Sequence, residues 1–266
     1  MLNQSTILAQ DMDLFDIREN GLYGFINKNG GAIIEPQYVY AGRFHEGMSI
    51  VEVNGKMGFI NPKGEMVISP RYQYRTSFSE GLAGVYLNEK YGFIDTSGRV
   101  VVDFIYNGGF GFSGGLAPVE FENGMWGYID KAGNVIVKPK FDLASSFAEG
   151  YGCVMERDKY GFINKWGDYV IPVTYESAED FSEGLASVTI DGLDGYVDKN
   201  GLIVIPAVYE STGQFRGDMA PVQKDGLWGM IDKEGEIVVP IKYTYLGYSV
   251  RGINSSRYGG KIWIYQ

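Results

Sequence analysis

Few side chains in this sequence have the chemistry that catalysis or metal binding requires. The chain of 266 residues contains one histidine, His45, and one cysteine, Cys153. A zinc site needs several His, Cys or carboxylate ligands, and a nucleophilic Ser or Cys needs a base beside it. Cys153 lies within a strand-like segment, which is typical of an inert core residue, and we expect His45 to be a solvated loop residue. We therefore expect no catalytic residue, no metal site and no cofactor, and we predict that the protein is not an enzyme.

Carboxylates are abundant enough to form a glycosidase-like acid pair, but their spacing favours another role. One position recurs seven times and carries either Asn or Asp: Asn27, Asn61, Asp95, Asp130, Asn164, Asp198 and Asp232. Because Asn occurs there as readily as Asp, the position does not require a charge. Each is followed three residues later by glycine, a pattern typical of a tight turn capped by an Asx side chain. An enzyme with a carboxylate site is therefore the least favoured hypothesis.

A second acidic position is a candidate for partner binding. It is occupied by Glu46, Glu80, Glu149 and Glu183. If these glutamates line up on successive repeats, they form an acidic column that suits a basic peptide. The alternative is that each carboxylate caps its own loop.

Trp166 is the most unusual residue in the chain for its position. The equivalent residues are small or polar: Asn29, Lys63, Ser97, Ala132, Asn200 and Glu234. A tryptophan at a polar turn tip can be a contact residue of a binding surface, or it can fold back onto the neighbouring repeat. Asp168 and Tyr169 follow it closely and add a charge and a second aromatic ring. We therefore name Trp166, Asp168 and Tyr169, with the four glutamates, as the candidate partner-binding residues.

These positions belong to a repeat that covers nearly the whole chain. An aromatic–Gly–aromatic–Ile–Asp pattern, as in Trp126–Asp130, places glycines at 24, 58, 92, 127, 161, 195 and 229, with spacings of 34 or 35 residues. A second glycine follows each of these six residues later, and an aromatic residue lies eight beyond it. Phenylalanine then recurs at 44, 78, 112, 147, 181 and 215. Such a period indicates a repeat architecture.

Each repeat predicts three short antiparallel strands and no helix. In the second repeat, a strand over 48–53 leads through Asn54-Gly55, a strong hairpin signal, into a strand over 56–61. The third strand follows the Asx turn and has consecutive apolar residues, as in Met66-Val67-Ile68. We expect this third strand to be buried on both faces and to end at the following proline. The phenylalanine is expected to be a plug under a loop.

The pattern resembles that of the bacterial WG-repeat (KWG) family. The resemblance rests on the aromatic–Gly motif, Asp/Asn, Lys-x-Gly, an aliphatic run, Pro, Tyr, and a final Phe-x-Glu-Gly-Leu-Ala, of which Leu82-Ala83, Leu116-Ala117 and Leu185-Ala186 are examples. Trp126 and Trp228 keep the family tryptophan, whereas Met57 and Asp194 depart from it. The resemblance implies a bacterial β-repeat protein used for binding, and it implies no catalytic residues.

We predict an all-β fold of tandem 34-residue repeats forming an open or partly wound β-superhelix or solenoid. A closed propeller-like ring is the alternative, although propeller blades have four strands in about 40–45 residues. Residues 1–12 are expected to be an N-terminal extension. Residues 13–266 are expected to form a single array of seven full repeats with atypical terminal strands, including one at 260–264 around Trp263.

Composition limits the partners. A net charge of -10 disfavours nucleic acid and anionic membranes and favours a basic partner. No apolar run is long enough for membrane insertion. We predict a soluble, non-enzymatic scaffold that binds a protein or peptide, either cytoplasmic or exported after signal removal. A glycan or cell-envelope binder is the alternative, motivated by 20 Tyr and 4 Trp.

Overall fold

The computed structural model describes residues 14–74 and 76–246. The chain divides into two compact units, Met1–Val135 and Ile136–Gln266, and each is considered by itself. The described residues form strands and turns, and no helix that could cross a membrane is found among them. The expected extension, residues 1–12, and the expected last strand, residues 260–264, lie outside the described residues. A single continuous array over 13–266 stays a prediction.

Three longer strands recur in each repeat, as the sequence predicts. The first strands are β1 (Phe15–Glu19), β5 (Ser49–Val53), β9 (Leu82–Leu87), β13 (Leu116–Glu120), β17 (Gly152–Glu156), β21 (Leu185–Ile190) and β25 (Met219–Lys224). The second strands are β2 (Leu22–Ile26), β6 (Lys56–Ile60), β10 (Lys90–Asp95), β14 (Trp126–Asp130), β18 (Lys159–Ile163), β22 (Leu193–Asp198) and β26 (Leu227–Asp232). The third strands are β3 (Ala32–Tyr38), β7 (Met66–Tyr72), β11 (Val100–Tyr106), β15 (Val135–Phe141), β19 (Tyr169–Tyr175), β23 (Ile203–Tyr209) and β27 (Ile237–Tyr243).

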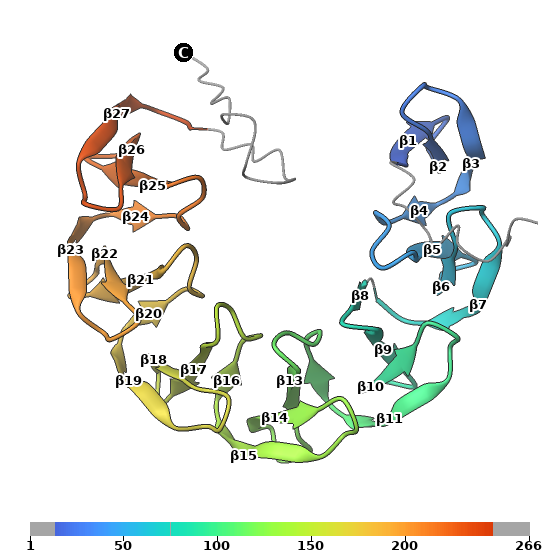
Figure 1. The fold of residues 1–266 in the computed structure, drawn as a ribbon, viewed down its shortest axis with the longest axis horizontal. Coiled ribbons are helices and arrows are strands. Elements are labelled where there is room, and N and C mark those ends of the chain that lie inside the picture. Colours follow the sequence, from blue (N-terminus) through green and yellow to red (C-terminus); the bar gives the residue numbers. More distant parts are fainter. Residues whose placement is uncertain (1–13, 75, 247–266) are drawn as a thin grey trace, which may run out of the picture. The chain divides into compact units, whose positions relative to one another are not determined.

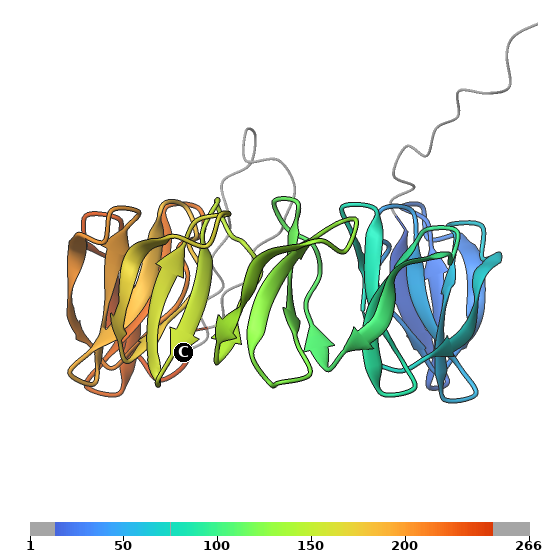
Figure 2. The ribbon, with the colours of Figure 1, turned by 90° about the horizontal axis from the view of Figure 1, so that it is seen from below.

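The structure adds a short fourth strand to six of the sheets. These two-residue strands are β4 (Tyr40–Ala41), β8 (Phe78–Ser79), β12 (Gly108–Gly109), β16 (Leu143–Ala144), β20 (Ser177–Ala178) and β24 (Ser211–Thr212). The sheet orders are β1-β2-β3, β4-β5-β6-β7, β8-β9-β10-β11, β12-β13-β14-β15, β16-β17-β18-β19, β20-β21-β22-β23 and β24-β25-β26-β27. The boundary between the two units falls within β15. Within each unit, successive sheets stand side by side (Figures 1 and 2).

The hairpin between the first and second strands is built as expected. Asn54 and Gly55 have φ values of 51° and 74°, and Asp225 and Gly226 have 52° and 72°. Positive φ at both central residues is what a tight hairpin turn requires, and its twist matches that of the strands it joins.

The motif glycine allows the second and third strands to approach closely. A Cβ atom built on Gly92 would lie 2.7 Å from the carbonyl oxygen of Val102, so no side chain fits there. Opposite this glycine, the pairing of β10 with β11 shifts register between Tyr91↔Tyr106 and Phe93↔Val102. The extra residues bulge outward, which increases the local twist.

The expectation that the third strand is buried on both faces is wrong. Met66 and Val67 are exposed, and only Ile68 and the final Tyr72 are buried. The physical reason is that β7 is an edge strand. The next repeat covers β7 at Ile68, against which the turn glycine Gly98 lies, and at Tyr72, whose ring packs against Phe104.

Proline does not end the third strand either. Pro70 lies inside β7, which continues to Tyr72. Proline lacks the N–H that a central strand would donate, so an edge strand at its bulge is where it is tolerated.

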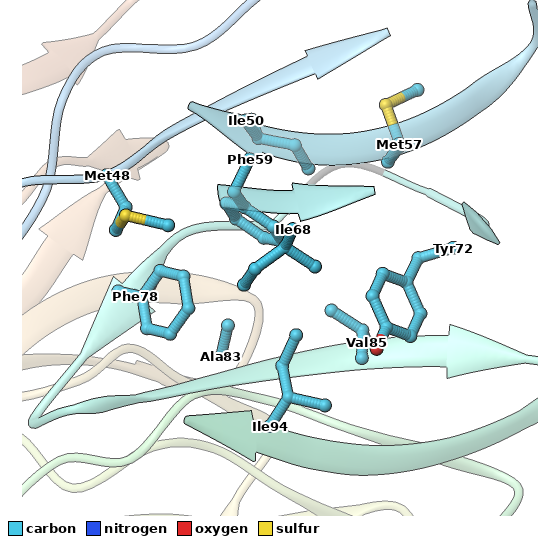
Figure 3. Packing of buried hydrophobic residues seen from close by; sticks show 10 residues of the cluster. All are labelled: Met48, Ile50, Met57, Phe59, Ile68, Tyr72, Phe78, Ala83, Val85 and Ile94. Carbon is cyan, nitrogen blue, oxygen red and sulfur yellow. The ribbon is translucent and has the colours of Figure 1, made fainter. Parts of the chain in front are cut away.

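The core lies between successive sheets rather than within one. In the first unit, one buried cluster joins Phe59 and Ile68 of one sheet with Phe78 and Val85 of the next (Figure 3). The recurring phenylalanine joins the two sheets: the ring centroids of Phe59 and Phe78 are 5.0 Å apart. Equivalent pairs are Phe25–Phe44, Phe93–Phe112, Phe162–Phe181 and Tyr196–Phe215. The expected plug is therefore confirmed, and it links neighbouring repeats.

Candidate functional site

The turn between β18 and β19 holds Trp166 in a fixed backbone. The side-chain oxygen of Asn164 accepts hydrogen bonds from the N–H groups of Trp166 and Asp168, both at 3.0 Å. Gly167 closes the turn by donating to the Asn164 carbonyl at 3.0 Å, and it lies against Val137 of the preceding edge strand. All these contacts are made by backbone N–H groups of residues 166–168, so the turn places no demand on the Trp166 side chain.

Trp166 does not fold back onto the neighbouring repeat. Its side chain is 67% exposed. The structure therefore shows an exposed side chain at a turn tip and not one packed on the neighbouring repeat.

Tyr169 lies at the start of β19, close to Trp166 in the chain, and is 41% exposed. Its ring packs edge-on against Phe141, with 6.3 Å between centroids. Its hydroxyl donates a hydrogen bond to Glu156. Burial and the Glu156 carboxylate both raise the pKa of Tyr169. The ring is therefore held in place and remains partly exposed.

A lysine ammonium group lies over each of these two rings. The ammonium nitrogen of Lys165 is 4.7 Å from the centre of the Trp166 ring, and that of Lys140 is 4.5 Å from the centre of the Tyr169 ring. Neither lysine forms an ion pair with any residue among 14–74 and 76–246. The side chain of Asp168, by contrast, accepts a hydrogen bond from Asn164. The charges over the two rings are therefore positive, while the nearby carboxylates of Glu156 and Asp168 accept hydrogen bonds from Tyr169 and Asn164.

The next repeat also exposes two apolar side chains near this strand. The turn glycine Gly201 lies against Ile171 of β19, which places Leu202 and Ile203 beside the outward-facing side of that strand. Leu202 is 66% exposed and Ile203 is 49% exposed. We call Trp166, Tyr169, Leu202 and Ile203, with Lys140 and Lys165, the Trp166 face.

Leu202 is also unusual in the sequence for its position in the repeat. Its equivalents in the other repeats are Gly31, Glu65, Arg99, Asn134, Asp168 and Glu236. A leucine in that set is as unusual as a tryptophan among turn tips.

The Asx position caps turns, as expected. The Oδ1 atom of Asp95 accepts hydrogen bonds from the N–H groups of Ser97 and Arg99, both at 3.0 Å. The Ser97 hydroxyl also donates a hydrogen bond to Asp95 and makes the largest contribution. Together, these hydrogen bonds lower the pKa of Asp95 to about 2. Asn61 makes the same two backbone contacts without a charge.

The four glutamates connect repeats instead of capping their own loops. Glu46 accepts a hydrogen bond from the N–H of Gly81, Glu80 from Gly115, Glu149 from Gly184, and Glu183 from Gly217. Three of them also form ion pairs at 3.1–3.2 Å: Glu80 with Lys131, Glu149 with Lys199 and Glu183 with Lys233. Each carboxylate therefore already has partners inside its own unit, which leaves it less available to an outside ligand.

The contacts of Glu183 predict a pH dependence of stability. Burial opposes its ionisation, but the N–H groups of Asp218 and Gly217 and the Lys233 ammonium outweigh burial and lower its pKa. A lowered folded-state pKa stabilises the fold above the ordinary glutamate value, and this contribution is lost as the pH falls through the folded-state value. Urea unfolding should show Glu183→Gln less stable at neutral pH by less than about 1 kcal/mol, since the pair is partly exposed.

The matched control is Glu234→Gln, at an exposed turn tip. The difference between Glu183→Gln and wild type should shrink as the pH falls below about 4.3, while that of Glu234→Gln should stay constant. A Glu183→Gln difference that is the same in acid and at neutral pH would show that its charge has no such role.

Neither His45 nor Cys153 belongs to a catalytic arrangement. His45 is exposed in its loop, as expected. Cys153 is buried, and burial raises the pKa of its thiol to about 12. Across the described ranges, no group of His, Cys, Asp and Glu is arranged to hold a metal ion.

Comparison with known proteins identifies the repeat and the fold. A family model described as "WG containing repeat" matches residues 23–56, 57–91, 91–124, 126–160, 160–193, 195–228 and 228–253. No curated protein gives a significant match.

Two solved structures illustrate the likeness of fold. BamB from Moraxella catarrhalis has a TM-score of 0.51 and 12% identity, over 88% of this chain and 89% of that one. A eukaryotic initiation factor has a TM-score of 0.62 and 11% identity, over 86% and 73%. At these identities the likeness shows a β-propeller-like fold alone.

Proposed function

Because the chain belongs to the WG-repeat family, we propose that it is a non-enzymatic repeat scaffold that binds a protein or peptide through the Trp166 face. The observation that carries this proposal is the 67% exposure of Trp166 on a turn whose hydrogen bonds need only its backbone. Exposed aromatic anchors beside apolar side chains are the usual energetic centre of a binding patch. Repeat arrays also present extended surfaces that suit such partners. A bacterial source, and a cytoplasmic or exported location, stay predictions from the sequence.

The charge beside the rings favours an acidic segment in the partner. The net charge of -10 predicts a basic partner, because long-range electrostatic attraction depends on the charge of the whole surface. At contact distance, however, the charges that lie over the two rings are the ammonium groups of Lys140 and Lys165. A short apolar peptide carrying carboxylates would cover the rings and pair with both lysines.

A glycan is the second candidate ligand. The exposed Trp166 ring supports it, since sugars stack on exposed aromatic faces. The Lys165 ammonium lies 4.7 Å from the centre of that ring and would have to move aside. This makes the peptide the better-supported ligand.

The test compares the full chain with two variants on peptide and glycan arrays. The peptide array contains acidic, basic and neutral apolar segments. We expect acidic apolar peptides to bind, and Trp166→Ala to weaken them by roughly 1–3 kcal/mol. Glu234→Ala removes a side chain at the same turn position of another repeat and should leave binding unchanged.

Three results would contradict the proposal. Equal affinity of Trp166→Ala and wild type would remove Trp166 from the site. Preference for basic peptides would restore the partner expected from net charge. Binding to glycans alone would favour the second candidate.

A further inference from the structure

A polar cavity in the first unit has no role in the repeat architecture or in the Trp166 face. Its volume is about 380 Å³, within the range of about 300–1,000 Å³ that holds small ligands. The side chains of Arg43, His45, Thr76, Ser77 and Ser79 line it together with Tyr40 and Ile50, and Gly42 and Gly111 complete the wall. We call it the Arg43 cavity.

The two residues that can carry positive charge have no partner of their own. Among residues 14–74 and 76–246, the side chains of Arg43 and His45 form no ion pair, and neither makes a side-chain hydrogen bond. In a chain with a net charge of -10, most basic groups have carboxylates to choose from. A guanidinium without one, facing a hollow rich in hydroxyls, suits an anion supplied from outside.

The loop that carries these residues is fixed on both sides. Between them, Phe44 packs on Phe25 with 4.8 Å between ring centres. The backbone of His45 exchanges two hydrogen bonds with Met48, at 2.9 and 3.0 Å. Ile50 belongs to the buried core that Figure 3 shows. The backbone that carries Arg43 and His45 is therefore held in place, which reduces the backbone entropy lost on binding.

The repeat register does not dictate the charge at this place. In the repeat register, the positions of Gly42 and Arg43 are occupied in the second unit by Glu179 and Asp180. Burial raises the pKa of both carboxyl groups. The position of Arg43 is thus basic in the first repeat and acidic at Asp180, while the position of His45 carries Arg216 in the second unit. The charge of this place therefore varies from repeat to repeat.

The donor set matches a phosphate better than a carboxylate. Arg43 alone can donate two parallel hydrogen bonds, which satisfies a carboxylate. His45 presents an N–H in either tautomer, and the Ser77 hydroxyl adds a donor, so a further oxygen can be bound. The Ser79 hydroxyl already donates to the Phe112 carbonyl at 2.7 Å and fixes the wall. Tyr40 and Ile50 give the remaining space an apolar side.

We propose that the Arg43 cavity binds a small organic phosphate. The phosphate lies against Arg43, His45 and Ser77, and the organic part lies against Tyr40 and Ile50.

Isothermal titration of the full chain tests this with four probes: glucose 6-phosphate, inorganic phosphate, acetate and glucose. We expect glucose 6-phosphate to bind more tightly than inorganic phosphate, and acetate and glucose not to saturate the protein. Arg43→Gln should weaken glucose 6-phosphate by about tenfold or more, because a charge-assisted hydrogen bond is lost. Arg43→Lys keeps the charge without the planar fork, so its affinity should be intermediate.

The control is Lys63→Gln, which removes one exposed positive charge from a turn tip of the same unit, outside the cavity wall. It should bind like wild type, and all variants should melt at the wild-type temperature. Unchanged affinity in Arg43→Gln, or equal losses in Lys63→Gln and Arg43→Gln, would overturn the site. Acetate binding as tightly as glucose 6-phosphate would overturn the choice of phosphate. If inorganic phosphate bound as tightly as glucose 6-phosphate, the proposed contact of the organic group with Tyr40 and Ile50 would be overturned.

Discussion

Replacing Gly92 by valine is expected to lower the free energy of unfolding by about 2 kcal/mol or more, because overpacking forces the backbone apart. The atoms that a new Cβ would meet are the carbonyl oxygens of Val102 and Asp103, at 2.7 and 2.9 Å. Both belong to the backbone of β11, so no rotamer change can relieve the contact. Urea unfolding of the full chain measures the loss.

A matched pair of alanine variants isolates the cause. Gly92→Ala adds the same Cβ as Gly111→Ala, but at Gly111 the nearest atom would be 3.8 Å away, in ordinary contact. Gly111→Ala should change stability by less than about 1 kcal/mol. If the two variants unfold alike, the glycine is only tolerated at the motif position and close strand approach does not select it.

Phe112→Ala is expected to have the largest effect, about 3 kcal/mol or more, through the cavity that it leaves in the core. Phe112 is 1% exposed, and its ring lies 4.7 Å from that of Phe93 in the preceding sheet. The loss therefore falls on the contact between two sheets rather than on either hairpin. Urea unfolding again provides the measurement.

Phe110→Ala is the matched control because it removes the same side chain two residues away. Phe110 is 49% exposed and stacks only on Trp126, with 5.5 Å between centres. It should lose less than half as much stability as Phe112→Ala. Equal losses of stability in the two variants would mean that the recurring phenylalanine position is not the one that joins neighbouring repeats.

Local patterns predicted the elements well because each is dictated by a few neighbouring residues. Asn54-Gly55 fixed the hairpin, and the Asx–Gly spacing fixed the turn. The burial of the third strand failed for the opposite reason. The consecutive apolar residues Met66-Val67-Ile68 predict a strand that is buried on both faces. Such burial requires other elements to cover both faces, and the edge strand is covered only in part. The two-residue strands have no sequence pattern long enough to be read.

The candidate site was predictable only where a residue breaks the repeat. Trp166 departs from six small or polar equivalents, so its unusual position is visible in the sequence. The glutamates keep to the register, and nothing in sequence tells a capping carboxylate from one that reaches the next repeat. Lys140 and Lys165 are ordinary surface residues until the structure places them over aromatic rings. The Arg43 cavity is lined by residues from three loops, and only the tertiary structure shows that these loops lie together.

The central claim is that residues which depart from the repeat are available for binding because folding does not need them. The most direct test is the urea unfolding of Trp166→Ala beside Phe112→Ala in the full chain. We predict that Trp166→Ala loses less than about 1 kcal/mol, the most that an exposed cation–π contact with Lys165 supplies. A loss approaching that of Phe112→Ala would show that Trp166 is a packing residue and would contradict the account.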